Sequence, residues 1–177
     1  MLILVTGGSG SGKSEYAQRR CMELEAGPKL YIATMEVYDE ESRRRVGRHR
    51  AIRDGMGFET VECQRHLGQA SIVPGQVVLL ECVSNLAANE MFSGVETRKP
   101  VQVADTVVRG VEHLLQSASH VVAVTNQVFS DGITYDAQTE DYRRCLAQIN
   151  NRLAEMADEA VEVVCGIPLL LRQSQQP

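Results

Sequence analysis

The sequence predicts an α/β fold, in which a mostly parallel sheet carries helices on both faces. Two observations lead to this prediction. Short apolar runs rich in β-branched residues recur along the chain, and longer segments with apolar positions three and four residues apart lie between them. Runs of four to six such residues suit strands that are buried on both faces, which is the environment of strands in a parallel sheet.

The expected elements alternate along the chain. The first helix should end at Gly27 and Pro28, because this pair stops a helix. Polar turns or loops are expected at residues 73–76, 93–100 and 130–136, and residues 173–177 should be frayed. The predicted strands are residues 2–5, 29–33, 77–82, 121–125 and 161–165, and the predicted helices are residues 13–26, 39–53, 101–117 and 137–158.

Length and charge restrict the classes of function. The chain of 177 residues is expected to form one domain over residues 1–177. No apolar run reaches the roughly 20 residues that cross a bilayer, and no basic leader follows Met1, so we expect a cytoplasmic protein with no membrane span. The formal net charge of −5 argues against a nucleic-acid partner. Anionic ligands must then be held by local groups rather than by the overall field.

The cysteines are scattered, with no CxxC pair and no histidine at metal-ligand spacing. An odd, dispersed set of this kind predicts buried thiols rather than a structural zinc site or a disulfide framework. The five residues are Cys21, Cys63, Cys82, Cys145 and Cys165.

A glycine-rich loop follows the first predicted strand. Residues 6–14, TGGSGSGKS, match the spacing GxxxxGK[ST], and a predicted helix follows them. Glycines permit positive φ angles, so successive backbone N–H groups converge on phosphate oxygens at a helix N-terminus. Lys13 is expected to reach the β- and γ-phosphates of GTP or ATP, and the Ser14 hydroxyl to bind Mg²⁺. The motif predicts a sheet of P-loop NTPase type, RecA-like, with phosphate bound by Gly7, Gly8, Ser9, Gly10, Ser11, Gly12, Lys13 and Ser14.

An acidic residue closes one of the predicted buried strands. Glu81 follows the apolar run 77–80. A carboxylate at the end of a buried strand is costly unless it is paired or bound to a metal, so Glu81 is a candidate second ligand for Mg²⁺. The alternative, a strand end that faces solvent, stays open at this point.

The arginine-rich segment 42–54, SRRRVGRHRAIRD, has two interpretations. In the first, it is a solvated helix whose arginines pair with acidic residues 39–41. In the second, His49 is a nucleophile, because the surrounding cations keep its ring neutral and a neutral imidazole can attack phosphorus to form a phosphoramidate. On a helix, Arg45, His49 and either Ile52 or Arg53 lie on one face.

Five segments together resemble one known family. ILVTGGSGSGKS (3–14), LYIATMEVYDEESRRRVGRHRAIR (30–53), FETVEC (58–63), VVLLECVSNL (77–86) and INNRLAEMADEAVEVVCGIPLLLR (149–172) occur in its order. The family is that of adenosylcobinamide kinase / adenosylcobinamide-phosphate guanylyltransferase, which assembles the nucleotide loop of vitamin B12. The resemblance covers nearly the whole chain, and the YIAT strand followed by the histidine helix is more specific than the phosphate loop alone.

The resemblance implies two reactions and a set of site residues. The enzyme would phosphorylate the aminopropanol hydroxyl of adenosylcobinamide, and it would then transfer GMP from GTP through a guanylyl-histidine at His49 to give adenosylcobinamide-GDP. The preference for GTP rests on this resemblance, because the guanine signature NKxD is absent. Family members are also expected to form homo-oligomers, with a trimer as the expected form. Besides the glycine loop, the implied nucleotide-binding residues are Ala33, Thr34, Met35, Arg50, Ala51, Ile52, Arg53, Glu62 and Glu81.

The chain departs from the family pattern after the predicted strand at 121–125. The family commonly has TNEVG there, whereas this chain places Gln127 and Phe129 at the carboxylate and glycine positions, and Arg144 stands where an acidic residue is usual. A lost carboxylate would remove a metal partner or a base from the kinase reaction, and the histidine segment is unaffected. Two alternatives remain: a small-molecule P-loop kinase without a covalent intermediate, and a nucleotide-binding regulator.

Overall fold

The computed structural model describes residues 1–24, 27–37, 39–94, 97–129 and 132–174, except for the side chains of residues 42, 45, 48, 49 and 52. A seven-stranded sheet with the order β3-β2-β4-β5-β1-β6-β7 forms its centre, and only the pairing of β6 with β7 is antiparallel. The strands are β1 (Leu2–Thr6), β2 (Lys29–Ala33), β3 (Phe58–Glu62), β4 (Val77–Glu81), β5 (His120–Val124), β6 (Glu159–Val164) and β7 (Ile167–Gln173).

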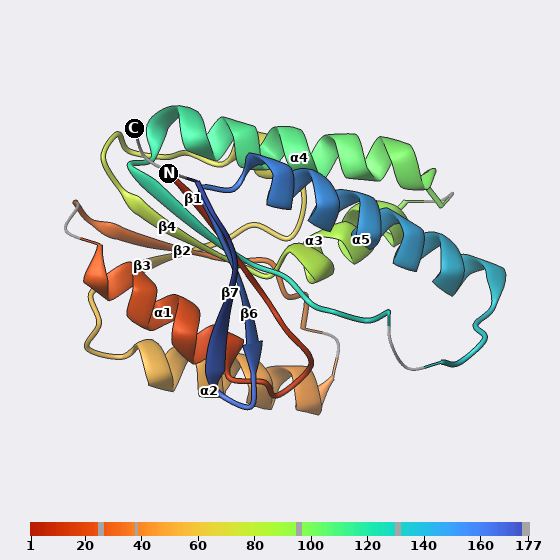
Figure 1. Cartoon of the computed structure of the whole chain (residues 1–177), viewed down its shortest axis with the longest axis horizontal. Coiled ribbons are helices and arrows are strands. Elements are labelled where there is room, and N and C mark those ends of the chain that lie inside the picture. The colour runs from red at the N-terminus through yellow and green to blue at the C-terminus, as the bar shows by residue number, and fades with distance from the viewer. Residues whose placement is uncertain (25–26, 38, 95–96, 130–131, 175–177) are drawn as a thin grey trace.

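Helices cover both faces of this sheet, as predicted (Figure 1). α1 and α2 lie on one side, and α3, α4 and α5 lie on the other. A short 3₁₀ helix, η1 (Leu67–Gln69), packs against α4. The α-helices are α1 (Lys13–Glu23), α2 (Glu40–Arg53), α3 (Val83–Phe92), α4 (Pro100–Ser117) and α5 (Ala137–Met156).

Strand alternation divides the core into two layers. Leu2 and Leu4 of β1 face the layer that contains α3, α4 and α5, whereas Ile3 and Val5 face the layer that contains α1. All five residues of the interior strand β4 are buried, which explains why its sequence is an unbroken apolar run up to Glu81.

Four elements were not predicted, namely β3, the 3₁₀ helix η1, α3 and β7. β3 (FETVE) lies at the sheet edge and has only two apolar residues, and most of its residues are exposed, so it has no apolar run to reveal it. α3 begins two residues after the end of β4, and β7 is exposed along its whole length. The prediction of a frayed terminus from residue 173 is wrong for Gln173, which ends β7, while residues 175–177 lie outside the described part.

The boundaries of the predicted helices shift slightly. α1 ends at Glu23, three residues before the expected end, and residues 25–26 are not described. α5 ends at Met156, where Ala157 turns into β6. Among the described residues, no helix is both long and apolar enough to cross a membrane.

A close contact between α4 and η1 provides a test of the fold. A Cβ added at Gly110 of α4 would lie 2.8 Å from Cβ of Leu67, which is fully buried. Gly110→Ala should therefore lower the free energy of unfolding by about 1–3 kcal/mol, measured by urea denaturation. Gly47→Ala on α2 is the matched control, since a Cβ there meets nothing within 4 Å and alanine has the higher helix propensity. Equal stability of the two variants would contradict the packing described.

Candidate active site

The carboxyl ends of four parallel strands form one wall of the site. The register pairs Ala33 of β2 with Glu62 of β3 on one side and with Glu81 of β4 on the other, and Glu81 pairs in turn with Val124 of β5. Parallel strands bring such residues to the same sheet edge, where ligands bind in open α/β folds. Two carboxylates therefore lie in one row with apolar residues between and beside them.

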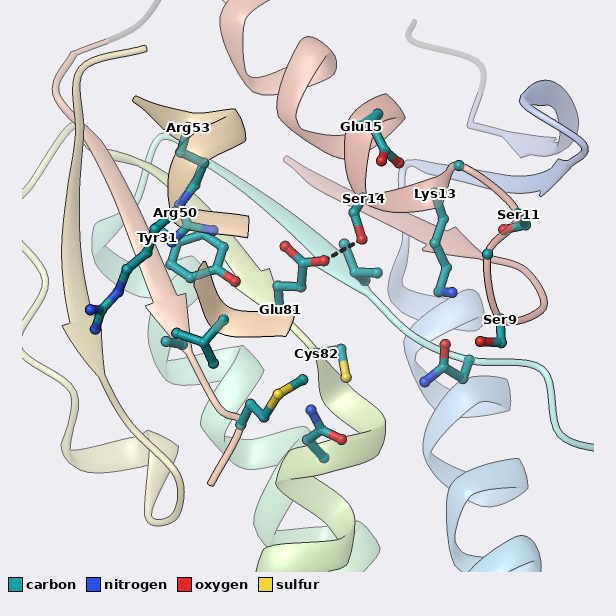
Figure 2. Close-up of a pocket in the computed structure, with 18 of the residues that line it drawn as sticks. Ser9, Ser11, Lys13, Ser14, Glu15, Tyr31, Arg50, Arg53, Glu81 and Cys82 are labelled. Carbon is teal, nitrogen blue, oxygen red and sulfur yellow. Dashed lines mark hydrogen bonds between the residues drawn. The ribbon is translucent and has the colours of Figure 1, made fainter. Parts of the chain in front are cut away.

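The glycine loop between β1 and α1 forms the second wall. Gly10 and Gly12 adopt φ angles of 70° and 88°, which favour glycine. A Cβ at Gly7 would lie 2.5 Å from the Val163 carbonyl oxygen, so the loop also needs glycine where it approaches β6. Lys13 Nζ donates a hydrogen bond of 2.9 Å to the Gly8 carbonyl, so the ammonium group lies over the loop (Figure 2).

Ser14 and Glu81 connect the two walls. The Ser14 hydroxyl, in the first turn of α1, donates a hydrogen bond to Oε1 of Glu81. A hydroxyl and a carboxylate are hard oxygen donors, and Mg²⁺ is bound in proteins by few such groups together with substrate phosphates and water. No cluster of three His, Cys, Asp or Glu side chains occurs among the described residues, so the donor set fits a metal shared with a phosphate.

The opposite end of the site is cationic and aromatic. The Arg53 guanidinium carbon, at the end of α2, lies 3.4 Å from the centre of the Tyr31 ring. Arg50 forms an ion pair of 3.2 Å with Glu62, but both side chains are about 60% exposed, so the pair contributes little stability. Burial raises the pKa of Tyr31, and the negative charge of Glu81 raises it further, so the hydroxyl keeps its proton at physiological pH.

A cavity of about 670 Å³ joins these two ends, and Figure 2 shows the loop side chains facing Tyr31 and the arginines across it. Of the predicted residues, Gly7, Gly8, Thr34 and Ala51 do not line it. Thr34 is buried, and its hydroxyl instead bonds the backbone N and O of Cys82. The side chains of His49 and Ile52 are not described. The predicted residues that line the cavity are Ser9, Gly10, Ser11, Gly12, Lys13, Ser14, Ala33, Met35, Arg50, Arg53, Glu62 and Glu81.

Sequence reasoning missed several lining residues. Tyr31 lies two residues before Ala33 in β2, and Asn85 belongs to the unpredicted α3. Asn126 follows β5, where the rule for carboxyl ends of parallel strands could have indicated it. Gln127, which the sequence marked only as a departure from the family pattern, also lines the cavity. The Gln127 backbone N–H donates to the Gly7 carbonyl at 3.1 Å, so this residue lies beside the glycine loop.

Comparison with known proteins identifies the family. The family model described as cobinamide kinase / cobinamide phosphate guanyltransferase matches residues 3–171. The chain belongs to this family. It is 32% identical to the bifunctional adenosylcobalamin biosynthesis protein CobU of Salmonella typhimurium, over 97% of this chain and 100% of that protein. CobU of Escherichia coli is also 32% identical, with the same coverage. The resemblance seen in the sequence is thus confirmed over nearly the whole chain.

Solved structures confirm the fold class at much lower sequence identity. A prototypical ATPase from the type III secretion system of pathogenic bacteria superposes with a TM-score of 0.56 at 14% identity, covering 91% of this chain and 50% of that one. The flagellar accessory protein FlaH from Methanocaldococcus jannaschii superposes with a TM-score of 0.51 at 11% identity, covering 98% of this chain and 78% of that one. These likenesses show that this chain shares its fold, a mostly parallel sheet with helices on both faces, with both proteins.

The position of Lys13 predicts a measurable loss of binding. Lys13→Ala should weaken the affinity for a fluorescent GTP analogue by about tenfold or more in the presence of Mg²⁺, because it removes a charge-assisted contact to phosphate. Lys99→Ala is the matched control, since Lys99 is exposed at the start of α4 and does not line the cavity. Equal dissociation constants for the two variants would contradict the assignment of the loop.

Proposed function

We propose that this chain carries out both reactions of its family at one triphosphate site, phosphorylating adenosylcobinamide and then transferring GMP to the product. The observation that carries the proposal is the shared cavity. The glycine loop and the Ser14–Glu81 pair bound it at one end, and α2, the helix that contains His49, bounds it at the other through Arg50 and Arg53. One bound triphosphate can then present its γ-phosphate to an acceptor and its α-phosphate to the helix.

In the first reaction, the aminopropanol hydroxyl oxygen of adenosylcobinamide attacks the γ-phosphorus of GTP or ATP. The new O–P bond forms as the bond to the β-phosphate oxygen breaks, and the hydroxyl proton is lost as the nucleoside diphosphate leaves. Lys13 and the backbone N–H groups of the loop hold the transferred group and compensate its charge. Ser14 and Glu81 would hold Mg²⁺, which supplies further charge compensation when bound.

In the second reaction, an imidazole nitrogen of His49 attacks the α-phosphorus of GTP. The N–P bond forms, the bond to the β-phosphate oxygen breaks, and pyrophosphate leaves toward the loop. A phosphate oxygen of adenosylcobinamide phosphate then attacks the same phosphorus, which releases His49 and gives adenosylcobinamide-GDP. Arg50 and Arg53 line the cavity one and four residues after His49, so they supply positive charge beside this reaction.

The departures from the family pattern bear on the first reaction. Gln127 lines the cavity beside the loop as an amide, where the family pattern has a carboxylate. Glu81, however, keeps its carboxylate on the Ser14 hydroxyl. Because a carboxylate remains beside the metal-binding serine, we infer that the kinase reaction is retained.

Labelled GTP tests both reactions. With α-³²P-GTP and Mg²⁺, the wild type should acquire an acid-labile covalent label. With γ-³²P-GTP the protein should stay unlabelled, and the label should appear in the released pyrophosphate, in phosphorylated adenosylcobinamide and in the adenosylcobinamide-GDP made from it. Unlabelled ATP is added to a parallel reaction to test whether it competes as the phosphate donor. His49→Ala should reduce the covalent label to background, because the nucleophile is gone, and should leave γ-³²P transfer within a fewfold of wild type.

The matched control for this prediction is His113→Ala. The His113 ring lies 3.1 Å from the Ala70 carbonyl and does not line the cavity, so the variant should keep the covalent label. A full covalent label in His49→Ala would exclude His49 as the nucleophile. Transfer of γ-³²P without any α-label in the wild type would instead indicate a simple kinase.

We further propose that the protein is a homo-oligomer, a trimer as the family resemblance implies, and that it works in the reducing cytoplasm. The exposed edge strand β7 supports association, because it presents large apolar side chains to solvent at Ile167, Leu169, Leu170 and Leu171. The five free cysteines support a reducing compartment.

Charge placed on β7 tests the oligomer. Leu169→Asp with Leu171→Asp should shift the mass measured by light scattering from three chains of 19.5 kDa to one, because carboxylates disrupt an apolar contact. Val73→Asp is the control, since Val73 is an exposed apolar residue in the turn before β4. A double variant that keeps the wild-type mass would exclude β7 from the interface.

A further inference from the structure

We propose that Tyr31 is a positioning residue that links the helix carrying His49 to the metal-binding carboxylate Glu81. Its ring would hold Arg53 and thereby the end of α2, and its hydroxyl would orient Glu81. The inference rests on the proposed function, and it assigns a role to a residue that neither the glycine loop nor the histidine segment includes.

Few of the described side chains of α2 hold this helix against the sheet. Among the α2 residues whose side chains are described, only Arg53 is buried, with 7% of its surface exposed. Most others are exposed, and Glu40 pairs with Arg43 and Arg44 along the helix rather than with the sheet. The described side chains of α2 form no apolar stripe of the kind that normally docks a helix on a sheet. The placement of α2 must then depend on particular contacts.

The contact between Arg53 and Tyr31 is suited to that task. The guanidinium lies 3.4 Å from the ring centre, and Tyr31 is only 5% exposed. Cation–π contacts are stronger where water is excluded. Nη1 of Arg53 is buried and has no hydrogen-bond partner among the described residues, so the ring is the principal partner of this cation. The other tie from α2 to the sheet, Arg50 to Glu62, is exposed to solvent and weak.

The sheet register brings the Tyr31 hydroxyl to Glu81. Tyr31 pairs with Leu79 of β4, so Glu81, two residues further along, lies diagonally across on the same face. Figure 2 shows the hydroxyl pointing into the cavity toward Glu81. The negative charge of Glu81 is one cause of the raised pKa of Tyr31, in line with this closeness. Arg53, Tyr31, Glu81 and Ser14 are thus successive neighbours from the end of α2 to the start of α1.

Two substitutions separate the two parts of Tyr31. Tyr31→Phe keeps the ring under Arg53 and removes the hydroxyl from Glu81. It should raise the Mg²⁺ concentration for half-maximal rate by about threefold to tenfold in both reactions, with maximal rates within about twofold of wild type. Tyr31→Leu also removes the ring, so it should further lower the maximal rate of covalent guanylylation by about tenfold or more, while phosphoryl transfer at saturating Mg²⁺ falls less.

Tyr16 supplies the matched controls. It also has an arginine over its ring, Arg19 at 5.6 Å, and its hydroxyl donates to Glu159, but it does not line the cavity. Tyr16→Phe and Tyr16→Leu should leave both the Mg²⁺ dependence and the guanylylation rate unchanged. A double-mutant cycle adds a second readout. Arg53→Gln should lower the rate of covalent guanylylation by a smaller factor in Tyr31→Leu than in wild type, because the stacked pair is already broken in Tyr31→Leu.

The outcomes separate the two proposals. If wild type forms no GMP adduct, the proposed function fails. If wild type forms the adduct but the Tyr31 variants behave like the Tyr16 variants, or Arg53→Gln costs the same in both backgrounds, the positioning role is overturned. If circular dichroism shows that Tyr31→Leu does not fold, Tyr31→Phe supplies the tests. Its shift in the Mg²⁺ concentration for half-maximal rate decides whether the hydroxyl orients Glu81. Because the ring is kept in this variant, Arg53→Gln should lower the guanylylation rate by the same factor in Tyr31→Phe as in wild type.

Discussion

The parallel pairing of β3, β2, β4 and β5 is the constraint on which the site depends. It sets Glu62, Ala33, Glu81 and Val124 in one row, so that two carboxylates from separate segments face one cavity. Side chains alternate between the faces of a strand, and a slip of one residue in β4 would turn Glu81 into the opposite layer. The fully buried apolar residues of β4 resist such a slip, because they fill both layers of the core.

The C-terminal hairpin supports the glycine loop from the other side. The Gly166 N–H, in the turn between β6 and β7, donates to the Ser11 carbonyl at 2.8 Å, and a Cβ at Gly12 would lie 3.2 Å from the Gly166 Cα. The loop is therefore shaped by contacts with a hairpin from the far end of the sequence as well as by its own glycines. Its phosphate-binding conformation depends on a strand pair that lies about 150 residues later in the chain.

Sequence patterns predicted those parts of the fold and the site whose signal is local. Buried strands such as β4 can be recognised in the sequence as apolar runs. The residue types and spacing from Gly7 to Ser14 by themselves indicate a phosphate-binding loop. β3 was not predicted because an edge strand needs no continuous apolar run. β7 (IPLLLRQ) has such a run but contains Pro168, and a proline within a run argues against a strand. Tyr31 escaped for another reason: an aromatic residue in a buried strand looks like any core residue, and only the register shows that it meets both Glu81 and Arg53.

The two ends of the cavity differ in how firmly they are held. Ser14 and Glu81 belong to elements packed into the core, so the phosphate end is fixed by many buried contacts. α2 reaches the sheet through one buried cation and one exposed ion pair among its described side chains. In the proposed mechanism, a change at the phosphate end would therefore disturb both transfers, whereas a change at the Arg53 contact would fall mainly on the transfer assigned to His49. The proposal thus makes the two reactions separable, because it assigns the second to a helix whose described side chains make few contacts with the core.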